Sequence, residues 1–290
     1  MLLDLEALAN RKVAHADPVP VHDWSVLVPF FNERAYLAST IASLAGQSRT
    51  AKIILIDNGS TDDSGAIARA ECRRFGLDYL LIEERTPGKV AALRTGLRAV
   101  RSPYVATCDA DTWYPADYLA EAQRLLETKG TVVAGAFFAT RDMAPEQVTR
   151  AGRKMVSTAR LLPRQCHTGG AGQAFETAAL RRAGGFDGDR WGYVLEDHEI
   201  IHRMMKHGRM AYSEQLWCAP SSRERDRESI RWTLAERLLY SAAAPWAGDW
   251  FFYRFLASRL HARRLTSERI RERQFQEIGR ILNAAYPVCG

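Results

Sequence analysis

The segment YVATCDAD, residues 104–111, joins an apolar run to two carboxylates that stand one residue apart. The run predicts a buried strand, so Asp109 and Asp111 would lie at or just past its carboxyl end. Open α/β sheets bind their ligands at this edge. Two like charges held so close are costly unless a cation or hydrogen bonds compensate them. A hard divalent cation that carries phosphate oxygens would provide that compensation.

Strand and helix patterns alternate on both sides of this segment. Strands are predicted at residues 24–29, 52–56, 77–82, 104–108 and 131–138. Between them, Ser60 with Asp63 predicts a capping box for a helix that runs to Gly76, and Pro115 suits the first turn of a helix that ends near Gly130. Such alternation favours βαβ units and a largely parallel sheet. We therefore expect an α/β fold.

Composition sets the broad class of protein. The 290 residues are 47% hydrophobic and 26% charged, which suits one large domain or one domain with an extension. No uninterrupted apolar run is long enough to span a membrane, and the first residues carry acids where a signal peptide needs bases. Five cysteines without a C-x-x-C pair suit a reducing compartment. A cytoplasmic location is expected, and the net charge of +6 fits a polyanionic substrate, an acidic membrane surface or plain solubility.

Further polar clusters follow other predicted strands or precede a predicted helix. They are Asn32-Glu33, Asp57-Asn58-Gly59-Ser60 and, later, Glu196-Asp197. Taken singly, each is equally well explained as a helix cap or a turn chosen for its backbone angles. Taken together, they converge on one edge of a parallel sheet, where a nucleotide would lie.

The ordered set of motifs resembles a family 2 glycosyltransferase with the GT-A fold, over about residues 24–220. The motifs are VLVPFFNE (26–33), DNGSTDDS (57–64), GK (88–89), DAD (109–111), GGF (184–186) and ED (196–197). The resemblance implies an inverting hexosyltransferase that uses a nucleotide-sugar donor, most often a UDP-sugar, with Mn²⁺ or Mg²⁺. It implies a saccharide or lipid-linked acceptor, as in polysaccharide biosynthesis, and no nucleic-acid partner.

The resemblance also implies roles at the donor nucleotide. Pro29 and Glu33 would lie against the nucleoside, and Asp57 would contact the base. Lys89 matches the place of a cation near the nucleotide. Asp109 would contact the ribose or the metal shell, and Asp111 would be the metal ligand.

The acid of the ED motif, Asp197, matches the general base of the family. A leaving diphosphate develops charge that a divalent cation stabilises, while a carboxylate takes the proton of the attacking hydroxyl. We expect Asp197 in the first turn of a helix, where the helix dipole would lower its pKa and burial beside Glu196 would raise it. The sequence leaves that balance open, as it does the alternative that Asp197 only complements the dipole.

Residues near the ED motif are candidates for the acceptor or donor-sugar side. These are Glu196, His198 and the glycines Gly170 and Gly172 of a GGAG segment. Glycine allows a ligand to approach the backbone closely. A flexible connector is an equally good interpretation of that segment.

Two other functions compete with the transferase. His198-Glu199-Ile200-Ile201-His202 is a literal H-E-x-x-H, typical of zinc metalloproteases, although that hypothesis leaves Asp57, Asp109 and Asp111 unexplained. A nucleotide-binding module or nucleotidyltransferase on a related fold would share those acids but has no use for the Glu196-Asp197 pair.

The expected organisation has three parts. A leader covers residues 1–22, a GT-A catalytic domain covers 23–220, and a helical extension covers 221–290. Within the catalytic domain, 23–138 would be the nucleotide half and 139–220 the acceptor half. Aromatic residues interleaved with arginines at 240–264 resemble a peripheral membrane helix, and packing against the catalytic core or homo-oligomer formation explains them equally well.

Overall fold

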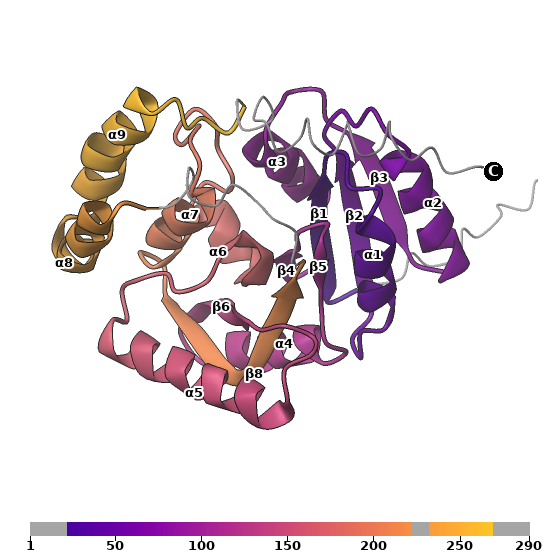
Figure 1. Cartoon of the computed structure of the whole chain (residues 1–290), viewed down its shortest axis with the longest axis horizontal. Helices are drawn as coiled ribbons and strands as arrows, with labels where there is room; N and C mark the ends of the chain where they lie inside the picture. Colours follow the sequence, from indigo (N-terminus) through magenta and orange to yellow (C-terminus); the bar gives the residue numbers. More distant parts are fainter. Residues whose placement is uncertain (1–21, 222–231, 269–290) are drawn as a thin grey trace, which may run out of the picture.

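The computed structural model describes residues 22–221 and 232–268, and its first half is a parallel sheet (Figure 1). Strands β1 (Trp24–Phe30), β2 (Ala51–Asp57), β3 (Tyr79–Glu83) and β4 (Tyr104–Thr107) lie in the order β3-β2-β1-β4. All their pairings are parallel. Their carboxyl ends therefore meet at one edge, as the alternating pattern predicts, and the predicted α/β class is confirmed.

The second half of the same sheet is mixed. Its strands are β5 (Thr112–Trp113), β6 (Thr131–Phe138), β7 (Gln173–Glu176) and β8 (Arg209–Pro220), in the order β7-β6-β8-β5 after β4. Strand β7 runs antiparallel to both β4 and β6, while β6 and β8 are parallel. The sheet thus changes direction at β7, and this brings the chain after residue 138 back to the carboxyl end of β4.

Helices cover both faces of the sheet with separate apolar cores. On one face lie α1 (Leu37–Ala45), α2 (Ser64–Arg74) and α4 (Tyr118–Leu126), and on the other lie α3 (Lys89–Ala99), α6 (Thr177–Arg182) and α7 (Glu196–Met204). Helix α5 (Pro145–Leu161) packs along β8. Helix α3 is amphipathic in the expected way, because Val90, Leu93 and Leu97 form its buried stripe.

The predicted capping box at Ser60 is wrong. Helix α2 begins at Ser64 after Asp63, and no side chain caps it. The Ser60 hydroxyl instead accepts a hydrogen bond from the Asn32 N–H at 3.1 Å. A contact between two loops therefore takes the hydroxyl that the local pattern assigned to the helix. The expectation that Pro115 lies in the first turn of a helix is also wrong, because α4 begins after Asp117 and Pro115 precedes it.

The C-terminal helices pack several of their aromatic residues onto the rest of the fold. They are α8 (Leu234–Trp250), the π-helix η3 (Phe251–Leu256) and α9 (Ala257–Ala262). Phe251 and Phe252 are fully buried in a cluster with Trp191 and Val194. Packing on the core therefore explains the buried aromatic residues of this segment. Within the described ranges, no helix is both long and apolar enough to cross a membrane. Of the predicted leader, residues 1–21 lie outside the described residues.

A buried ion pair within α7 also accepts a hydrogen bond from the C-terminal helices. The Arg203 guanidinium donates to both carboxylate oxygens of Glu199, at 2.7 and 2.8 Å, and to the carbonyls of Ala183 and Gly185. The hydroxyl of Tyr253, in η3, donates to the same carboxylate at 2.6 Å. Both charged side chains are almost completely buried. Each charge therefore depends on the other for compensation.

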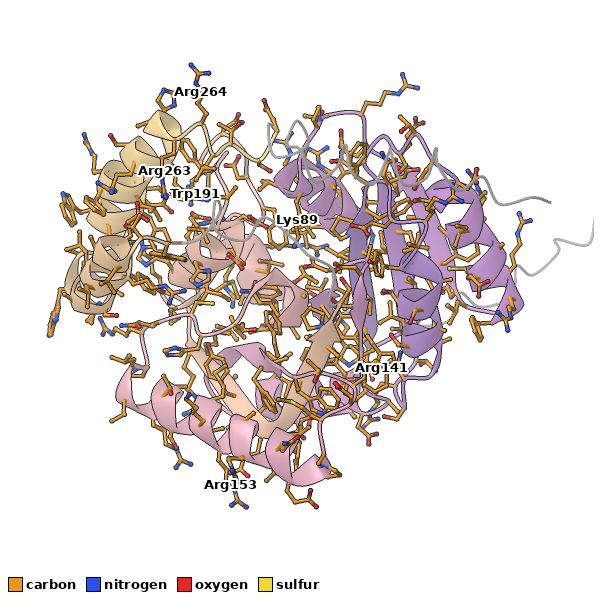
Figure 2. The ribbon with its side chains drawn as sticks, viewed as in Figure 1. Lys89, Arg141, Arg153, Trp191, Arg263 and Arg264 are labelled. Carbon is orange, nitrogen blue, oxygen red and sulfur yellow. The ribbon has the colours of Figure 1, made fainter. Side chains whose placement is uncertain are left out.

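We expect Arg203→Met to lower the free energy of unfolding by about 3–5 kcal/mol, because it leaves Glu199 buried without its cation. The matched control is Arg153→Met. Arg153 lies at the outer edge of the molecule (Figure 2) and pairs with the exposed Glu214, so its loss should cost less than about 1 kcal/mol. Urea unfolding followed by circular dichroism measures both. Equal effects of the two substitutions would contradict the buried-pair interpretation.

Candidate active site

Lys89, the first residue of α3, lies between the two halves of the sheet (Figure 2). Its Nζ is 2.5 Å from Asp109 Oδ1 and 3.8 Å from Glu196 Oε1. Burial opposes the charged form, but Asp109, Glu196 and Asp197 outweigh it and raise the pKa of Lys89. The ammonium group thus holds together carboxylates from β4 and from α7, which are far apart in the sequence.

The turn after β4 is fixed on both sides. The Asp109 N–H donates to the buried Tyr114 hydroxyl at 3.0 Å, and that hydroxyl donates to the Ala171 carbonyl. Asp111 is only 5% exposed. Its Oδ2 accepts from the Ser221 hydroxyl, and its carbonyl accepts from the Ser221 N–H, both at 2.8 Å. The end of β8 is therefore tied to the DAD turn.

The donor atoms at this turn fit a hard cation that a ligand helps to hold. Asp111 and Ser221 offer oxygen atoms, as Mg²⁺ and Mn²⁺ require. Across residues 22–221 and 232–268, no group of three or more His, Cys, Asp or Glu side chains is arranged to hold a metal ion. Mg²⁺ is commonly bound by one or two carboxylates plus substrate phosphates. The arrangement suits that mode and does not suit an all-protein cage.

Asp197 lies in the first turn of α7, as predicted, and accepts several hydrogen bonds. Its Oδ1 accepts from the backbone N–H and from ring Nδ1 of His198, each at 2.8 Å, and its Oδ2 accepts from the Gly170 N–H at 3.0 Å. Burial raises the pKa of Asp197, but His198 and Lys89 outweigh burial and hold that pKa below its usual range. Asp197 is therefore ionised at neutral pH.

Glu196 responds to the same surroundings in the opposite direction. Burial raises its pKa to about 7, with Lys89 opposing the shift and Asp197 adding to it. Adjacent carboxyl groups are thus pushed apart in proton affinity, a pattern that marks acid–base sites. Glu196 therefore keeps its proton to a higher pH than an ordinary glutamate does.

The glycine-rich segment touches this cluster directly. A Cβ at Gly170 would lie 3.0 Å from Lys89 Nζ and 3.5 Å from Asp197 Cβ, and one at Gly172 would lie 2.7 Å from Thr168 Oγ1. Only glycine permits so close an approach. The Thr107 hydroxyl also donates to the Gly170 carbonyl at 2.7 Å. The segment is therefore packed between β4 and α7, which does not fit a free connector.

The predicted nucleoside contacts form a second group. Pro29 and Asp57 lie at the ends of neighbouring strands. Asp57 Oδ1 accepts from the Ser60 N–H at 2.8 Å, and the Glu33 N–H donates to the Ser64 hydroxyl at 2.8 Å. These bonds shape two loops at the carboxyl edge of the sheet.

Asn58, which the sequence does not single out as a site residue, connects the two groups. Its Oδ1 accepts from the Gly88 N–H at 2.9 Å, and its amide donates to the carbonyls of Glu84 and Thr86. Asn58 thereby positions the residue just before Lys89. The sequence feature that could have indicated Asn58 is its place in the DNGS turn, residues 57–60.

Phe138 is another residue that the sequence does not indicate. Its side chain is 46% exposed at the end of β6. A Cβ at Gly169 would lie 3.0 Å from the Phe138 ring and 3.5 Å from Asp197 Oδ2. An exposed aromatic ring therefore flanks the predicted base. On another side, the rings of Trp232 and Tyr240 lie 5.2 and 6.2 Å from the His198 ring.

The H-E-x-x-H residues do not converge on a common point. His198 bonds to Asp197, while His202 Nε2 lies 2.7 Å from Asp249 and its ring stacks on Phe252. Glu199 is neutralised by Arg203. Their partners hold the three side chains in separate environments, so they do not form the zinc site of the protease hypothesis.

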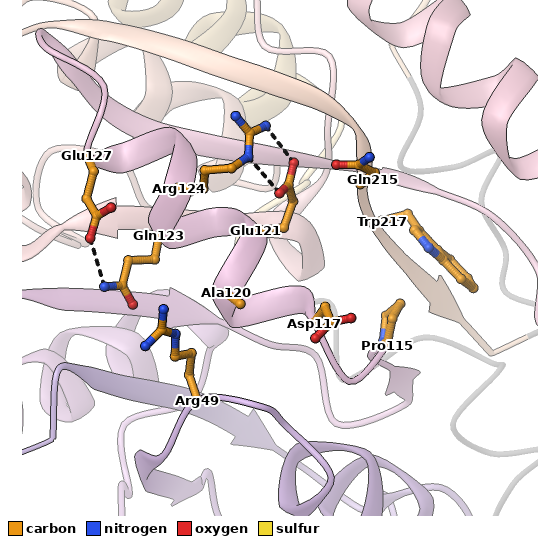
Figure 3. Close-up of a pocket in the computed structure, with 10 residues that line it drawn as sticks. All are labelled: Arg49, Pro115, Asp117, Ala120, Glu121, Gln123, Arg124, Glu127, Gln215 and Trp217. Atoms are coloured by element: carbon orange, nitrogen blue, oxygen red, sulfur yellow. Dashed lines mark hydrogen bonds and ion pairs between the residues drawn. The ribbon is translucent and has the colours of Figure 1, made fainter.

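A hollow of about 690 Å³ lies elsewhere, beside α4 and β8 (Figure 3). Its walls include Arg49, Asp117, Gln215 and Trp217, and an Arg124–Glu121 ion pair crosses one side. None of the predicted site residues lines it. The titratable cluster around Lys89 is therefore the better candidate, because it brings predicted site residues together and shifts the pKa values of Glu196 and Asp197 in opposite directions.

Comparison with known proteins identifies the family. The model of glycosyl transferase family 2 matches residues 25–183, which contain Lys89, Asp109 and Asp111. The chain belongs to this family. This membership confirms the resemblance that the motifs indicate, and the protease hypothesis is wrong.

Curated relatives share part of this family 2 chain. An undecaprenyl-phosphate 4-deoxy-4-formamido-L-arabinose transferase of Pseudomonas aeruginosa is 34% identical over 43% of the chain. A dodecaprenyl-phosphate galacturonate synthase of Rhizobium johnstonii is 33% identical over 33% of it. The matches span only 38% and 30% of those relatives' own lengths.

Solved structures confirm the GT-A fold of this family 2 chain. The mannosyltransferase PcManGT from Pyrobaculum calidifontis, in complex with GDP-Man and Mn²⁺, aligns with 93% of the chain and 83% of its own, at 22% identity and a TM-score of 0.61. TarS of S. aureus, residues 1–349 with UDP-GlcNAc, aligns with 75% of the chain and 64% of its own, at 16% identity and a TM-score of 0.52.

The shifted pKa of Glu196 makes stability depend on pH. The pKa rises from 4.5 to about 7 on folding, so the folded protein favours the protonated form of Glu196. The contribution of this group to the free energy of unfolding is fully present below about pH 4.5 and is lost as the pH rises through about 7. Glutamine stays neutral. Glu196→Gln should therefore raise the melting temperature over that of the wild type by roughly 5 °C at alkaline pH and change it little at acid pH.

Differential scanning fluorimetry across this pH range measures the difference. Glu83→Gln, at an exposed position on β3, is the control and should show no such trend. A difference for Glu196→Gln that is the same at all pH values would contradict the raised pKa.

Proposed function

We propose that this chain transfers a sugar, with inversion, from a UDP-sugar to the hydroxyl group of a saccharide or lipid-linked acceptor. The observation that carries the proposal is the Lys89 contact chain. Through one ammonium group, Asp109 at the donor edge of the sheet meets Glu196 beside the predicted base Asp197. Donor and acceptor groups would then meet over a few ångströms, which is what direct displacement requires.

The donor would lie along the carboxyl edge of β1, β2 and β4. Pro29, Glu33 and Asp57 would contact the uridine, and Asp109 would contact the ribose. Lys89 would face the diphosphate, with Asn58 fixing its loop. Bound at Asp111 and the Ser221 hydroxyl, Mn²⁺ or Mg²⁺ would supply charge stabilisation for the leaving diphosphate.

Asp197 would take the proton of the acceptor hydroxyl. Its low pKa keeps it ionised at neutral pH, and the Gly170 N–H and His198 hold its carboxylate in place. One base acting in a single displacement gives inversion. Gly170 and Gly172 would let the transferred sugar approach the backbone, and Glu196, His198 and the Phe138 ring would line the acceptor side.

We further propose a lipid-linked acceptor and a cytoplasmic location, with support from related proteins and from the thiols. The names of two relatives include polyprenyl phosphates, which favours the lipid-linked alternative here. Cys72, Cys108, Cys166 and Cys218 are free and buried, consistent with the reducing cytoplasm.

Asp197→Asn should lower turnover of the nucleotide sugar by about 10²–10⁴-fold, the usual contribution of a general base, without weakening UDP binding. Product release from the donor, followed by liquid chromatography, measures turnover. Asp249→Asn, at an exposed carboxyl on α8, is the control and should retain full activity. Wild-type turnover in Asp197→Asn would remove the assigned base.

Nucleotide binding can be tested without an acceptor. UDP should raise the melting temperature, and Mn²⁺ should add to the shift, because ligands stabilise the state they bind. We expect Asp57→Ala to abolish the UDP shift and Asp111→Asn to abolish only the metal increment. Asp142→Ala, on an exposed loop, should behave as the wild type. If no nucleotide diphosphate shifts the wild-type transition, the proposed function fails.

A further inference from the structure

Helix α8 exposes several large apolar side chains. Leu234 is 73% exposed, Leu238 63%, Trp246 89% and Trp250 49%. Tyr240, on the packed side of the same helix, is buried in the aromatic cluster of the extension. Apolar residues therefore occupy both sides of α8, whereas an ordinary surface helix would be polar on the outside.

The end of α5 and the loop after it add to this surface. Leu161 is 81% and Leu162 38% exposed. The following residues bind α8: the Arg164 guanidinium donates to the Pro245 carbonyl, and the Cys166 N–H donates to the Tyr240 hydroxyl at 3.0 Å. The loop thus lies against α8 at the left edge of the molecule (Figure 1).

We call this surface the outer patch. It comprises Leu161, Leu162, Leu234, Leu238, Trp246 and Trp250. These are six of the ten large hydrophobic residues that are exposed in the described ranges, so the distribution is clustered and not scattered. Exposed apolar residues gathered in this way on two segments that contact each other mark an interaction site.

The charges at the outer patch are mainly positive. Arg160 and Arg164 flank the leucines of the loop, and Arg237 stands exposed on α8 beside Leu238. The exposed acid on this part of α8 is Asp249, which Lys206 and His202 already engage. An anionic partner would be attracted, and a cationic one repelled.

We propose that the outer patch docks on the surface of an anionic lipid bilayer. Tryptophan and leucine side chains would enter the interface, and the arginines would meet the acidic headgroups, as in helices that lie in the membrane plane. A second copy of the chain fits less well. A two-fold dimer through this patch would bring the same arginines face to face.

The position of α8 would place the docked bilayer near the predicted acceptor side. Its inner side places Tyr240 6.2 Å from the His198 ring, next to Asp197. A helix with its side chains is about 10–12 Å thick. A bilayer under the outer patch would therefore lie about one helix diameter from the acceptor side. This inference goes beyond the proposed function, and it does not depend on the base or the metal.

The test is sedimentation of the full chain with vesicles of phosphatidylcholine that contain phosphatidylglycerol, compared with pure phosphatidylcholine. We expect binding only to the anionic vesicles. Leu238→Ser with Trp246→Ser should weaken it at least about tenfold, because both side chains lose their apolar burial in the bilayer interface. Phe75→Ser, at an exposed ring beside α2 on the opposite edge of the molecule, should bind as the wild type.

Two controls make the result decisive. The UDP thermal shift of each variant shows that it is folded, and it also separates a failure of docking from a failure of the proposed function. Sedimentation velocity reports self-association. Equal vesicle binding by the double variant and the wild type, or no binding by either, would overturn the proposal. So would a wild-type dimer that the double substitution dissociates without any vesicle binding.

Discussion

The Lys89 ammonium group is the interaction on which the active-site geometry depends. It contacts Asp109 at the end of β4 and Glu196 at the start of α7, two residues that the sheet reversal at β7 brings to the same edge. Without a cation there, the carboxylates would repel one another in a poorly solvated place. The glycine at position 170 suits this contact, because a Cβ there would press against the ammonium group at 3.0 Å.

Much of the nucleotide half is predictable because its determinants are local. Each parallel strand is an apolar run, and the residue after it lies at the carboxyl edge, so Asp57 and Asp109 could be placed without knowing any long-range contact. The helix that carries Asp197 was predictable for the same reason. Its ionisation was not, because the helix dipole and burial act in opposite directions and the deciding partner is the imidazole of His198.

The remaining features depend on contacts between distant segments. Ser60 looked like a helix cap, but Asn32 captures its hydroxyl. The H-E-x-x-H spacing suggested zinc, but Arg203, four residues after Glu199, takes the carboxylate. Phe138 gave no signal, because an aromatic residue at a strand end is ordinarily buried. In each case a competing partner, invisible in a short motif, decides the role of the residue.

The same arrangement around Lys89 sets a condition of electroneutrality on the donor. Asp109, Glu196 and Asp197 act on one ammonium group, so three carboxyl groups share a single lysine cation at this place. A nucleotide diphosphate adds further anionic oxygens to this place. It can enter only together with compensating charge, in the form of a divalent cation, a proton on Glu196, or both. Donor binding beside Lys89 would therefore be the binding of an anion together with the positive charges that neutralise it.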